Sequence, residues 1–185
     1  MDRERLAGHP GRVVWLTGLS GSGKSTIANA LECELHRIGM RTYVLDGDNV
    51  RQGLNSDLGF SDEDRAENVR RVAHVARLFL QAGVIVIVAL ISPFRADRDM
   101  ARALFAHGDF VEVYVNVPLA VAEQRDTKGL YRKARQGLLP QLTGVGSAYE
   151  PPLSPELVLC TDKETLSTCV DLMMPFLTNV PSAKN

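Results

Sequence analysis

The sequence predicts an α/β fold in which a doubly wound, parallel sheet of five strands is covered by helices on both faces. Short apolar runs of strand length alternate with longer stretches whose apolar residues recur at helical spacing. This alternation is typical of parallel sheets, because each crossover between parallel strands requires a connecting helix. A glycine-rich turn after the first run, and polar clusters after later runs, indicate the carboxyl edge of the sheet, where ligands of such folds bind.

The first half of the chain contains three predicted strands and two predicted helices. Apolar, β-branched runs predict the strands, as expected for strands buried on both faces; they lie at residues 12–17, 41–45 and 84–90. One helix is predicted at 24–38, with Gly39 as its C-cap. The other starts at Ser61 or Asp62 and runs to about Gln81, with its apolar side chains on one face.

The second half continues the alternation. A helix is predicted over about 96–106, a strand at 110–116, a short helix that begins at Pro118, a strand at 156–160 and a final helix at 163–178 that contains Pro175. The polar segment 126–155 carries glycine, proline and a basic run, which favours a mobile lid. We therefore expect a single domain over residues 1–185, with a flexible N-terminus at 1–11.

Composition restricts the classes of partner. The chain has 185 residues, a net charge of −1 and no apolar run long enough to span a bilayer. We expect neither nucleic acid nor a membrane as a partner, and the absence of a secretory signal pattern favours a cytoplasmic protein. Cys33, Cys160 and Cys169 lack C-x-x-C spacing, which predicts free thiols rather than a disulfide framework or a zinc site.

The turn between the first strand and the first helix matches the phosphate-loop pattern G-x-x-x-x-G-K-[ST]. Its glycines allow backbone N–H groups to surround a phosphate, Lys24 should reach the outer phosphates, and the Ser25 hydroxyl should ligate Mg²⁺. The predicted nucleotide-binding residues of this P-loop are Gly18, Ser20, Gly21, Ser22, Gly23, Lys24, Ser25 and Thr26. The sequence thus predicts a nucleoside-triphosphate site.

Two carboxylates, Asp46 and Asp48, follow the second strand at the edge where the phosphates should bind. Phosphoryl transfer requires Mg²⁺ and a carboxylate that orients or deprotonates the attacking hydroxyl. Asp48 is the predicted base and Asp46 the predicted support of Mg²⁺, although the two roles could be exchanged. The alternative is that both residues only form turns and helix caps.

Arg65 and Asn68 are spaced i, i+3 and therefore project from one side of the long helix near its start. With Arg51 they could bind a phosphate or sulfate group, whose oxygens an arginine fork matches. Phe60, in the preceding loop, is either a local anchor or a platform on which a base stacks. For Arg71, a solvated basic face is the open alternative.

Several segments together resemble the adenylyl-sulfate (APS) kinase family. These are the P-loop, Asp46–Asn55, Asp57–Ser61, Asp64–Arg71, Ile91–Arg95, Arg125–Tyr131, Leu142–Gly144 and Tyr149–Pro151, in the order of the family and within about residues 12–156. The resemblance implies a P-loop kinase that uses ATP and Mg²⁺ to phosphorylate the 3′-hydroxyl of adenosine 5′-phosphosulfate (APS), giving PAPS. The family is commonly dimeric, so a homodimer is possible.

The resemblance also implies roles for individual residues. Arg125 joins the ATP-binding residues, Phe60 stacks on the APS adenine, and Ser92 matches a serine described as a phosphoenzyme intermediate, although contact with substrate is the role we expect. The implied APS pocket consists of Asp48, Asn49, Val50, Arg51, Phe60, Arg65, Asn68, Ile91, Ser92, Lys128 and Leu142. Lys24, Asp46, Asp48 and Ser92 are the implied catalytic residues, and Ser25 and Asp46 the implied metal ligands.

The chain departs from the family at Leu142, where a phenylalanine is usual. Loss of one aromatic contact to the APS adenine should weaken binding by about 1 kcal/mol without removing activity. No sulfurylase domain is recognisable in the sequence, which suggests a stand-alone kinase or a fragment.

Two other functions remain as alternatives. Another small-molecule or nucleotide P-loop kinase would leave the segments around Phe60 and Arg65 unexplained. A catalytically silent nucleotide-binding regulatory protein should have lost Lys24 or Asp48, yet both are present. The segment 161–164 does not match the Asn-Lys-x-Asp motif that a GTPase requires.

Overall fold

The computed structural model describes residues 3–178. Its centre is a five-stranded parallel sheet in the order β2-β3-β1-β4-β5. The strands are β1 (Arg12–Thr17), β2 (Thr42–Asp46), β3 (Ile85–Ala89), β4 (Phe110–Asn116) and β5 (Leu157–Cys160). The helices are α1 (Arg3–Ala7), α2 (Lys24–Arg37), α3 (Gly47–Arg51), α4 (Asp62–Gln81), α5 (Arg95–Arg102), α6 (Leu119–Arg125), α7 (Leu130–Arg135) and α8 (Leu166–Thr178). The predicted doubly wound α/β fold is confirmed.

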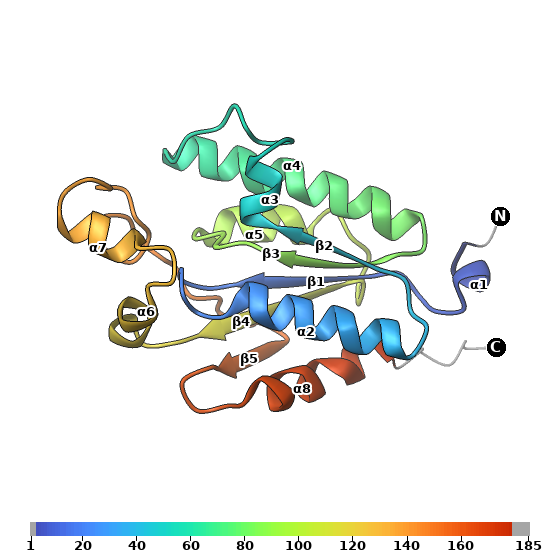
Figure 1. Cartoon of the computed structure of the whole chain (residues 1–185). Helices are drawn as coiled ribbons and strands as arrows, with labels where there is room; N and C mark the ends of the chain where they lie inside the picture. Colours follow the sequence, from blue (N-terminus) through green and yellow to red (C-terminus); the bar gives the residue numbers. More distant parts are fainter. Residues whose placement is uncertain (1–2, 179–185) are drawn as a thin grey trace.

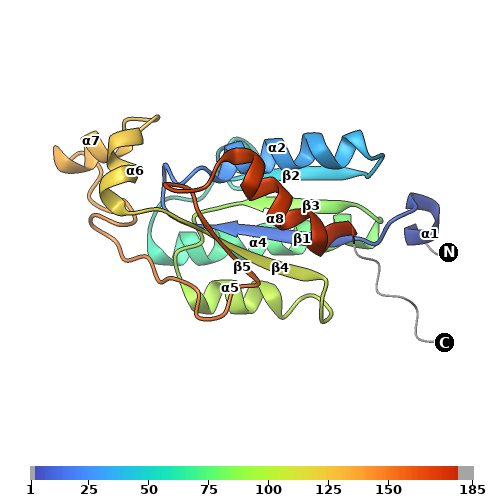
Figure 2. The ribbon, with the colours of Figure 1, turned by 90° about the horizontal axis from the view of Figure 1, so that it is seen from below.

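Helices cover both faces of the sheet: α2 and α8 lie on one face, and α4 and α5 on the other (Figure 2). The residues of β1 alternate between the two layers. Val14 and Leu16 pack with α2 and α8, whereas Val13 and Trp15 pack with α4 and α5. All four are at most 1% exposed. The central strand is therefore rigidly held, and so is the P-loop that follows it.

The strand order places the functional segments at one edge. From β1 the chain crosses to β2, returns to β3, and then crosses to β4 on the other side of β1. A crevice is expected at such a switch point, outside the carboxyl ends of the strands. Figure 1 shows α6 and α7 beyond this edge, so that segment 126–155 lies over the strand ends.

The helix starts follow local chemistry. Ser61 caps α4 by accepting a hydrogen bond from the Asp64 N–H at 3.2 Å, which decides between the two predicted caps. The final helix begins at Leu166, three residues later than predicted, and contains Pro175 without interruption. The helix predicted over 96–106 is shorter and ends at Arg102.

The N-terminal segment contains a helix that the sequence did not predict, and the flexibility expected of residues 1–11 stays a prediction. Residues 3–7 form α1, and His9–Gly11 are buried. The His9 Nε2 accepts a hydrogen bond from the Arg41 N–H at 2.9 Å, which fixes the entry to β1 beside β2. Residues 1–2 of this predicted segment lie outside the described residues. In the part of the chain that the structure describes, no helix is both long and apolar enough to cross a bilayer.

Candidate active site

The P-loop connects β1 to α2 in a conformation with positive φ at Gly18, Gly21 and Gly23, which favours glycine at all three positions. Gly18 has φ 152°, and a Cβ there would approach the Val115 carbonyl oxygen to 2.3 Å. Gly23 has φ 102° and forms the N-cap of α2. Because α2 starts at Lys24, the positive end of its dipole and its first N–H groups face the cleft described below. The loop is built to bind an anion.

Lys24 lies against this loop and is only 8% exposed. Its Nζ donates to the carbonyl oxygens of Gly18 and Leu19, at 2.9 and 2.7 Å. Burial, with a smaller contribution from the Lys128 charge, lowers the pKa of Lys24 from 10.5 to about 7, although Asp46 and Asp48 act in the opposite direction. The Lys24 ammonium is thus poorly compensated, and a bound phosphate would stabilise it.

Asp46 connects the P-loop to the segment after β2. One of its carboxylate oxygens accepts a hydrogen bond from the Ser25 hydroxyl at 2.5 Å. The other accepts from the Asp48 N–H at 2.9 Å, which makes Asp46 the N-cap of α3. Asp46 therefore fixes the position of Asp48 and also forms an oxygen pair with Ser25. A hydroxyl beside a carboxylate is a donor set that suits Mg²⁺.

Asp48 lines the cleft and contacts segment 126–155. Its carboxylate accepts a hydrogen bond from the Lys128 ammonium, and the two side chains form an ion pair although they are 61% and 50% exposed. The pair links α3 to segment 126–155 across the cleft. An exposed ion pair of this kind contributes little stability, so a ligand can replace either partner at small cost.

Two arginines converge on Phe60. The Arg51 guanidinium carbon lies 4.5 Å from the centre of the Phe60 ring, and that of Arg65 lies 5.9 Å from it. Burial lowers the pKa of both arginines, yet they stay charged. Within residues 3–178, neither arginine forms a salt bridge. Phe60 is 51% exposed, and it therefore provides an accessible aromatic face beside two cations whose hydrogen bonds go to backbone carbonyl oxygens rather than to carboxylates.

Asn68, one turn beyond Arg65, is 7% exposed. Its carboxamide oxygen accepts a hydrogen bond from the Asn55 amide at 2.8 Å. This contact leaves the Asn68 amide group to donate to a ligand in the cleft. Asn55 is fully buried and does not line the cleft, so it supports Asn68 from behind, which the sequence did not reveal.

Ser92 follows β3 in a strained conformation. Its φ of 38° lies in the left-handed region that residues with a Cβ rarely adopt, at a typical cost of about 1–3 kcal/mol. The Ser92 hydroxyl accepts a hydrogen bond from the Trp15 indole N–H at 3.1 Å, and the residue is 3% exposed. A nucleophilic serine needs an adjacent base, whereas the partner of Ser92 is an N–H donor.

Segment 126–155 is tied to the P-loop. The Tyr131 hydroxyl donates to the Ser20 carbonyl oxygen at 2.9 Å, and the Tyr131 ring packs with Leu142 in a small hydrophobic cluster. Arg125 donates to Thr161 Oγ1 at 3.0 Å and to the Gly21 carbonyl oxygen at 3.3 Å. These contacts hold the far wall of the nucleotide site. Tyr131 and Thr161 were not predicted, because their role depends on contacts between segments far apart in the sequence.

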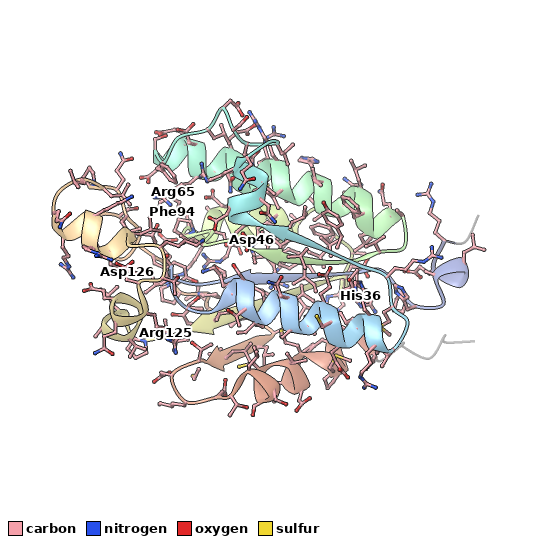
Figure 3. All side chains as sticks on the ribbon, viewed as in Figure 1. His36, Asp46, Arg65, Phe94, Arg125 and Asp126 are labelled. Carbon is pink, nitrogen blue, oxygen red and sulfur yellow. The ribbon has the colours of Figure 1, made fainter. Side chains whose placement is uncertain are left out.

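These groups enclose one cleft of about 850 Å³, at the upper end of the range of small-molecule sites. Figure 3 labels Asp46 at the end of β2, with Arg65 and Arg125 on either side of the strand ends. The predicted residues that line the cleft are Ser20, Gly21, Gly23, Lys24, Ser25, Thr26, Asp46, Asp48, Arg51, Phe60, Arg65, Asn68, Ile91, Ser92, Arg125, Lys128 and Leu142.

The structure differs from the prediction at Asn49 and Val50, which do not line the cleft. Val50 is 7% exposed and packs in the hydrophobic cluster with Leu45 and Val69, whereas Asn49 is exposed on α3. The reason is the short helix α3, which the sequence did not predict: its turn directs Val50 toward the sheet. Two predicted residues of the P-loop, Gly18 and Ser22, also do not line the cleft. Ser22 is fully buried, and its Oγ accepts a hydrogen bond from Lys24 Nζ at 3.3 Å.

A family model for adenylylsulphate kinase matches residues 10–160. The chain belongs to this family. The adenylyl-sulfate kinase of Burkholderia ambifaria is 62% identical over 162 residues, which cover 88% of this chain and 90% of the relative. That of Geotalea daltonii is 59% identical over 176 residues, covering 95% and 87%. The family resemblance seen in the sequence is confirmed.

Solved structures of the adenylylsulphate kinase family have the same fold. The Mycobacterium tuberculosis APS kinase CysC, solved in complex with AMPPNP and APS, is 45% identical with a TM-score of 0.86, covering 91% of this chain and 98% of that one. A hexameric APS kinase from Thiobacillus denitrificans is 33% identical with a TM-score of 0.68, covering 94% of this chain and 29% of that one. The chain is an enzyme of the adenylyl-sulfate kinase type.

Proposed function

We propose that this chain transfers the γ-phosphoryl group of ATP to the 3′-hydroxyl of APS, giving PAPS and ADP. The observation that carries the proposal is the division of the cleft. A P-loop with a buried lysine forms one half. An exposed aromatic ring beside two arginines that have no carboxylate partner among residues 3–178 forms the other, and Asp48, held by Asp46, lines the same cleft.

The donor half fits ATP. The N–H groups of the P-loop and Lys24 bind the phosphates, while Arg125 and Thr161 form the wall beyond them. Ser25 and Asp46 would hold Mg²⁺, which when bound neutralises charge on the phosphates. Among residues 3–178, no cluster of three or more His, Cys, Asp or Glu side chains could hold a metal ion. This fits Mg²⁺, which is usually bound by one or two protein ligands together with phosphate.

The acceptor half fits a nucleotide with a second anionic group. The adenine would stack on Phe60, and Arg51 and Arg65 would bind the phosphosulfate oxygens. In the free protein Lys128 is paired with Asp48. The anionic groups of APS would compete for the Lys128 ammonium, which would release the Asp48 carboxylate from the ion pair. Leu142 contributes an aliphatic contact only, since its side chain packs with Tyr131.

The chemistry assigned to the chain is positioning and proton transfer. Asp48 accepts the proton of the attacking 3′-hydroxyl, and Lys24 stabilises charge on the transferred phosphoryl group. Asp46 orients Asp48 through the bond to its N–H group. Ser92 contacts substrate rather than carrying the phosphoryl group, because its hydroxyl already accepts from Trp15. The lid, Mg²⁺ dependence and a homodimer stay predictions.

Acceptor specificity tests this proposal against another small-molecule kinase. Purified protein with ATP and Mg²⁺ is offered APS, AMP or a sugar alcohol, and ADP release is measured. We expect APS to be the strongly preferred acceptor, because only APS adds a sulfate for the arginines. Equal turnover with AMP would show that the site does not recognise the sulfate.

Replacement of Phe60 tests the acceptor half alone. We expect Phe60→Ala to raise the KM for APS by roughly 5- to 50-fold, because stacking on one aromatic ring contributes about 1–2 kcal/mol. The KM for ATP should stay within about twofold, since the hydrogen bonds of the P-loop do not involve Phe60. Phe60→Leu, which keeps apolar bulk but has no aromatic ring, should restore only part of the affinity for APS. Phe105 cannot serve as a control position, because its side chain packs against the core. An equal rise in both KM values would indicate a structural role.

The lowered pKa of Lys24 predicts proton uptake on nucleotide binding. Above about pH 7 Lys24 is largely neutral in the free protein, and an adjacent polyphosphate stabilises its charged form. Binding of ADP at about pH 8 should therefore take up close to one proton, and ADP affinity should fall as the pH rises further. Calorimetry in two buffers of different ionisation enthalpy measures this uptake. Lys24→Arg should show none, because a guanidinium does not titrate; the same uptake in that variant would contradict the assignment.

A further inference from the structure

The buried charge of Arg98 has no role in the mechanism above. Arg98, on α5, is 2% exposed and does not line the cleft. Its three donor nitrogens bind groups on three different segments. Nε donates to Glu112 on β4 at 2.8 Å, Nη1 to the Ser92 carbonyl oxygen at 2.6 Å, and Nη2 to the Glu150 carbonyl oxygen at 2.7 Å. The side chain therefore connects the sheet, the loop after β3 and the end of segment 126–155.

The contact with Ser92 explains how its strained backbone is maintained. A residue with positive φ and a Cβ relaxes unless its surroundings fix it. The Ser92 carbonyl oxygen accepts from Arg98 and, at 3.3 Å, from the Thr17 hydroxyl. Thr17 also donates to the Ile91 carbonyl oxygen at 2.7 Å. Arg98 supplies the shorter, charged bond and hence the stronger restraint on this carbonyl.

The contact with Glu150 joins the loop after β3 to the end of segment 126–155. The Glu150 N–H donates to the Pro93 carbonyl oxygen at 2.9 Å, and the Glu150 carboxylate accepts from the Arg95 N–H at 2.8 Å. Together with the bond from Arg98 to its carbonyl oxygen, Glu150 thus forms three hydrogen bonds, two with α5 and one with the loop that precedes α5. This loop lines the cleft with Ile91, Ser92 and Pro93. The position of that wall therefore depends on the hydrogen bonds that Arg98 and Glu150 form with the loop.

We propose that Arg98 is a positioning residue for the acceptor half of the site, holding Ser92 at positive φ and joining its loop to Glu150. The inference rests on the proposed function, because the acceptor is taken to be APS. Glu112 orients Arg98 in turn and is itself fixed by Arg102, whose Nη2 lies 3.1 Å from the second Glu112 oxygen. Arg98 thus connects β4 to the wall of the cleft, although its own side chain does not line the cleft.

Arg98→Lys keeps the charge but cannot bind three acceptors in one plane. We expect kcat/KM for APS to fall by roughly 10- to 100-fold, with the KM for ATP changed by no more than about twofold. Arg12→Lys is the matched control, because Arg12 is also a buried arginine paired with a carboxylate, that of Asp109, but it does not line the cleft and bonds to neither Ser92, Glu112 nor Glu150. It should lower the melting temperature and leave the KM for APS unchanged.

The backbone of Ser92 separates positioning from mere stability. Glycine adopts positive φ without the cost of a Cβ, so Arg98→Lys should cost much less in a Ser92→Gly background than in a Ser92→Ala background. Both backgrounds lack the hydroxyl that meets Trp15, and only the Cβ differs. If Arg98→Lys lowers the melting temperature but costs the same kcat/KM in both backgrounds, the proposal is overturned.

A second variant covers the case in which Arg98→Lys does not fold. Glu112→Gln keeps the shape of the carboxylate but weakens its hold on Arg98, and should give a smaller loss of the same kind: higher KM for APS, unchanged KM for ATP, and relief by Ser92→Gly. Equal changes in both KM values would overturn the role of Arg98. Absence of PAPS formation by the wild-type chain would instead refute the proposed function.

Discussion

Asp48→Asn should lower kcat by about a thousandfold while ADP binding stays close to wild type. Asparagine has the same shape but cannot accept a proton, and positioned general bases contribute about 10²- to 10⁴-fold. Nucleotide affinity should persist because the P-loop contacts do not involve the Asp48 side chain. The bond from the Asp48 N–H to Asp46 is a main-chain contact and remains. Single-turnover rates and ADP titration measure the two quantities.

A carboxylate outside the cleft provides the control for Asp48. Asp171 is exposed on α8 and is not part of the cleft wall. Asp171→Asn makes the same chemical change, and its turnover should match the wild type. Near-normal turnover of Asp48→Asn would show that another group accepts the proton. A loss of ADP affinity equal to the loss of turnover would indicate that Asp48 supports the nucleotide site instead.

Asp46→Asn should raise the Mg²⁺ concentration needed for half-maximal activity by roughly 10- to 100-fold. Groups that orient a bound metal typically contribute this much to metal affinity or activity. The asparagine oxygen can still accept the Asp48 N–H, so the cap of α3 survives. What is lost is the negative charge beside the Ser25 hydroxyl. Initial rates over a Mg²⁺ series at fixed ATP measure the effect.

The two aspartates can be told apart by this series. Asp48→Asn should lower the maximal rate at every Mg²⁺ concentration, whereas Asp46→Asn should be partly restored by high Mg²⁺. If high Mg²⁺ restores Asp48→Asn and not Asp46→Asn, the two carboxylates have exchanged roles. That outcome would keep the proposed reaction and change the assignment within it.

Local patterns in the sequence were enough to predict the sheet and the P-loop. The buried strands read as apolar runs because both of their faces are covered, and β4 begins and ends at the predicted residues. The helix after the P-loop begins at Lys24, as predicted. Gly23 is in the left-handed conformation, which a right-handed helix cannot contain, so Gly23 forms the N-cap. These features depend on neighbours in sequence, which a pattern can capture.

Features that depend on tertiary contacts could not be predicted in the same way. The short helix α3 directs Val50 into the core, and a five-residue helix capped by Asp46 leaves no periodic signal. The positive φ of Ser92 accompanies hydrogen bonds from Trp15, Thr17 and Arg98, which lie on other elements of the fold. No spacing in the sequence shows that Arg98 on α5 reaches Glu150, 52 residues away.

The acceptor was predicted by family resemblance and not by local physics. Arginines and an aromatic residue near a P-loop suggest an anionic, stackable ligand of many kinds. The structure adds that Arg51 and Arg65 meet at one Phe60 ring, which restricts the ligand to one with a planar group beside negative charge. The sulfate itself was inferred from the segments shared with APS kinases.

The most direct test of the proposed reaction is to incubate the purified chain with ATP, Mg²⁺ and APS and to separate the nucleotides by chromatography. We expect PAPS and ADP in equal amounts, with neither formed at a comparable rate by Asp48→Asn. A folded protein that binds ADP yet forms no PAPS from APS would refute this function.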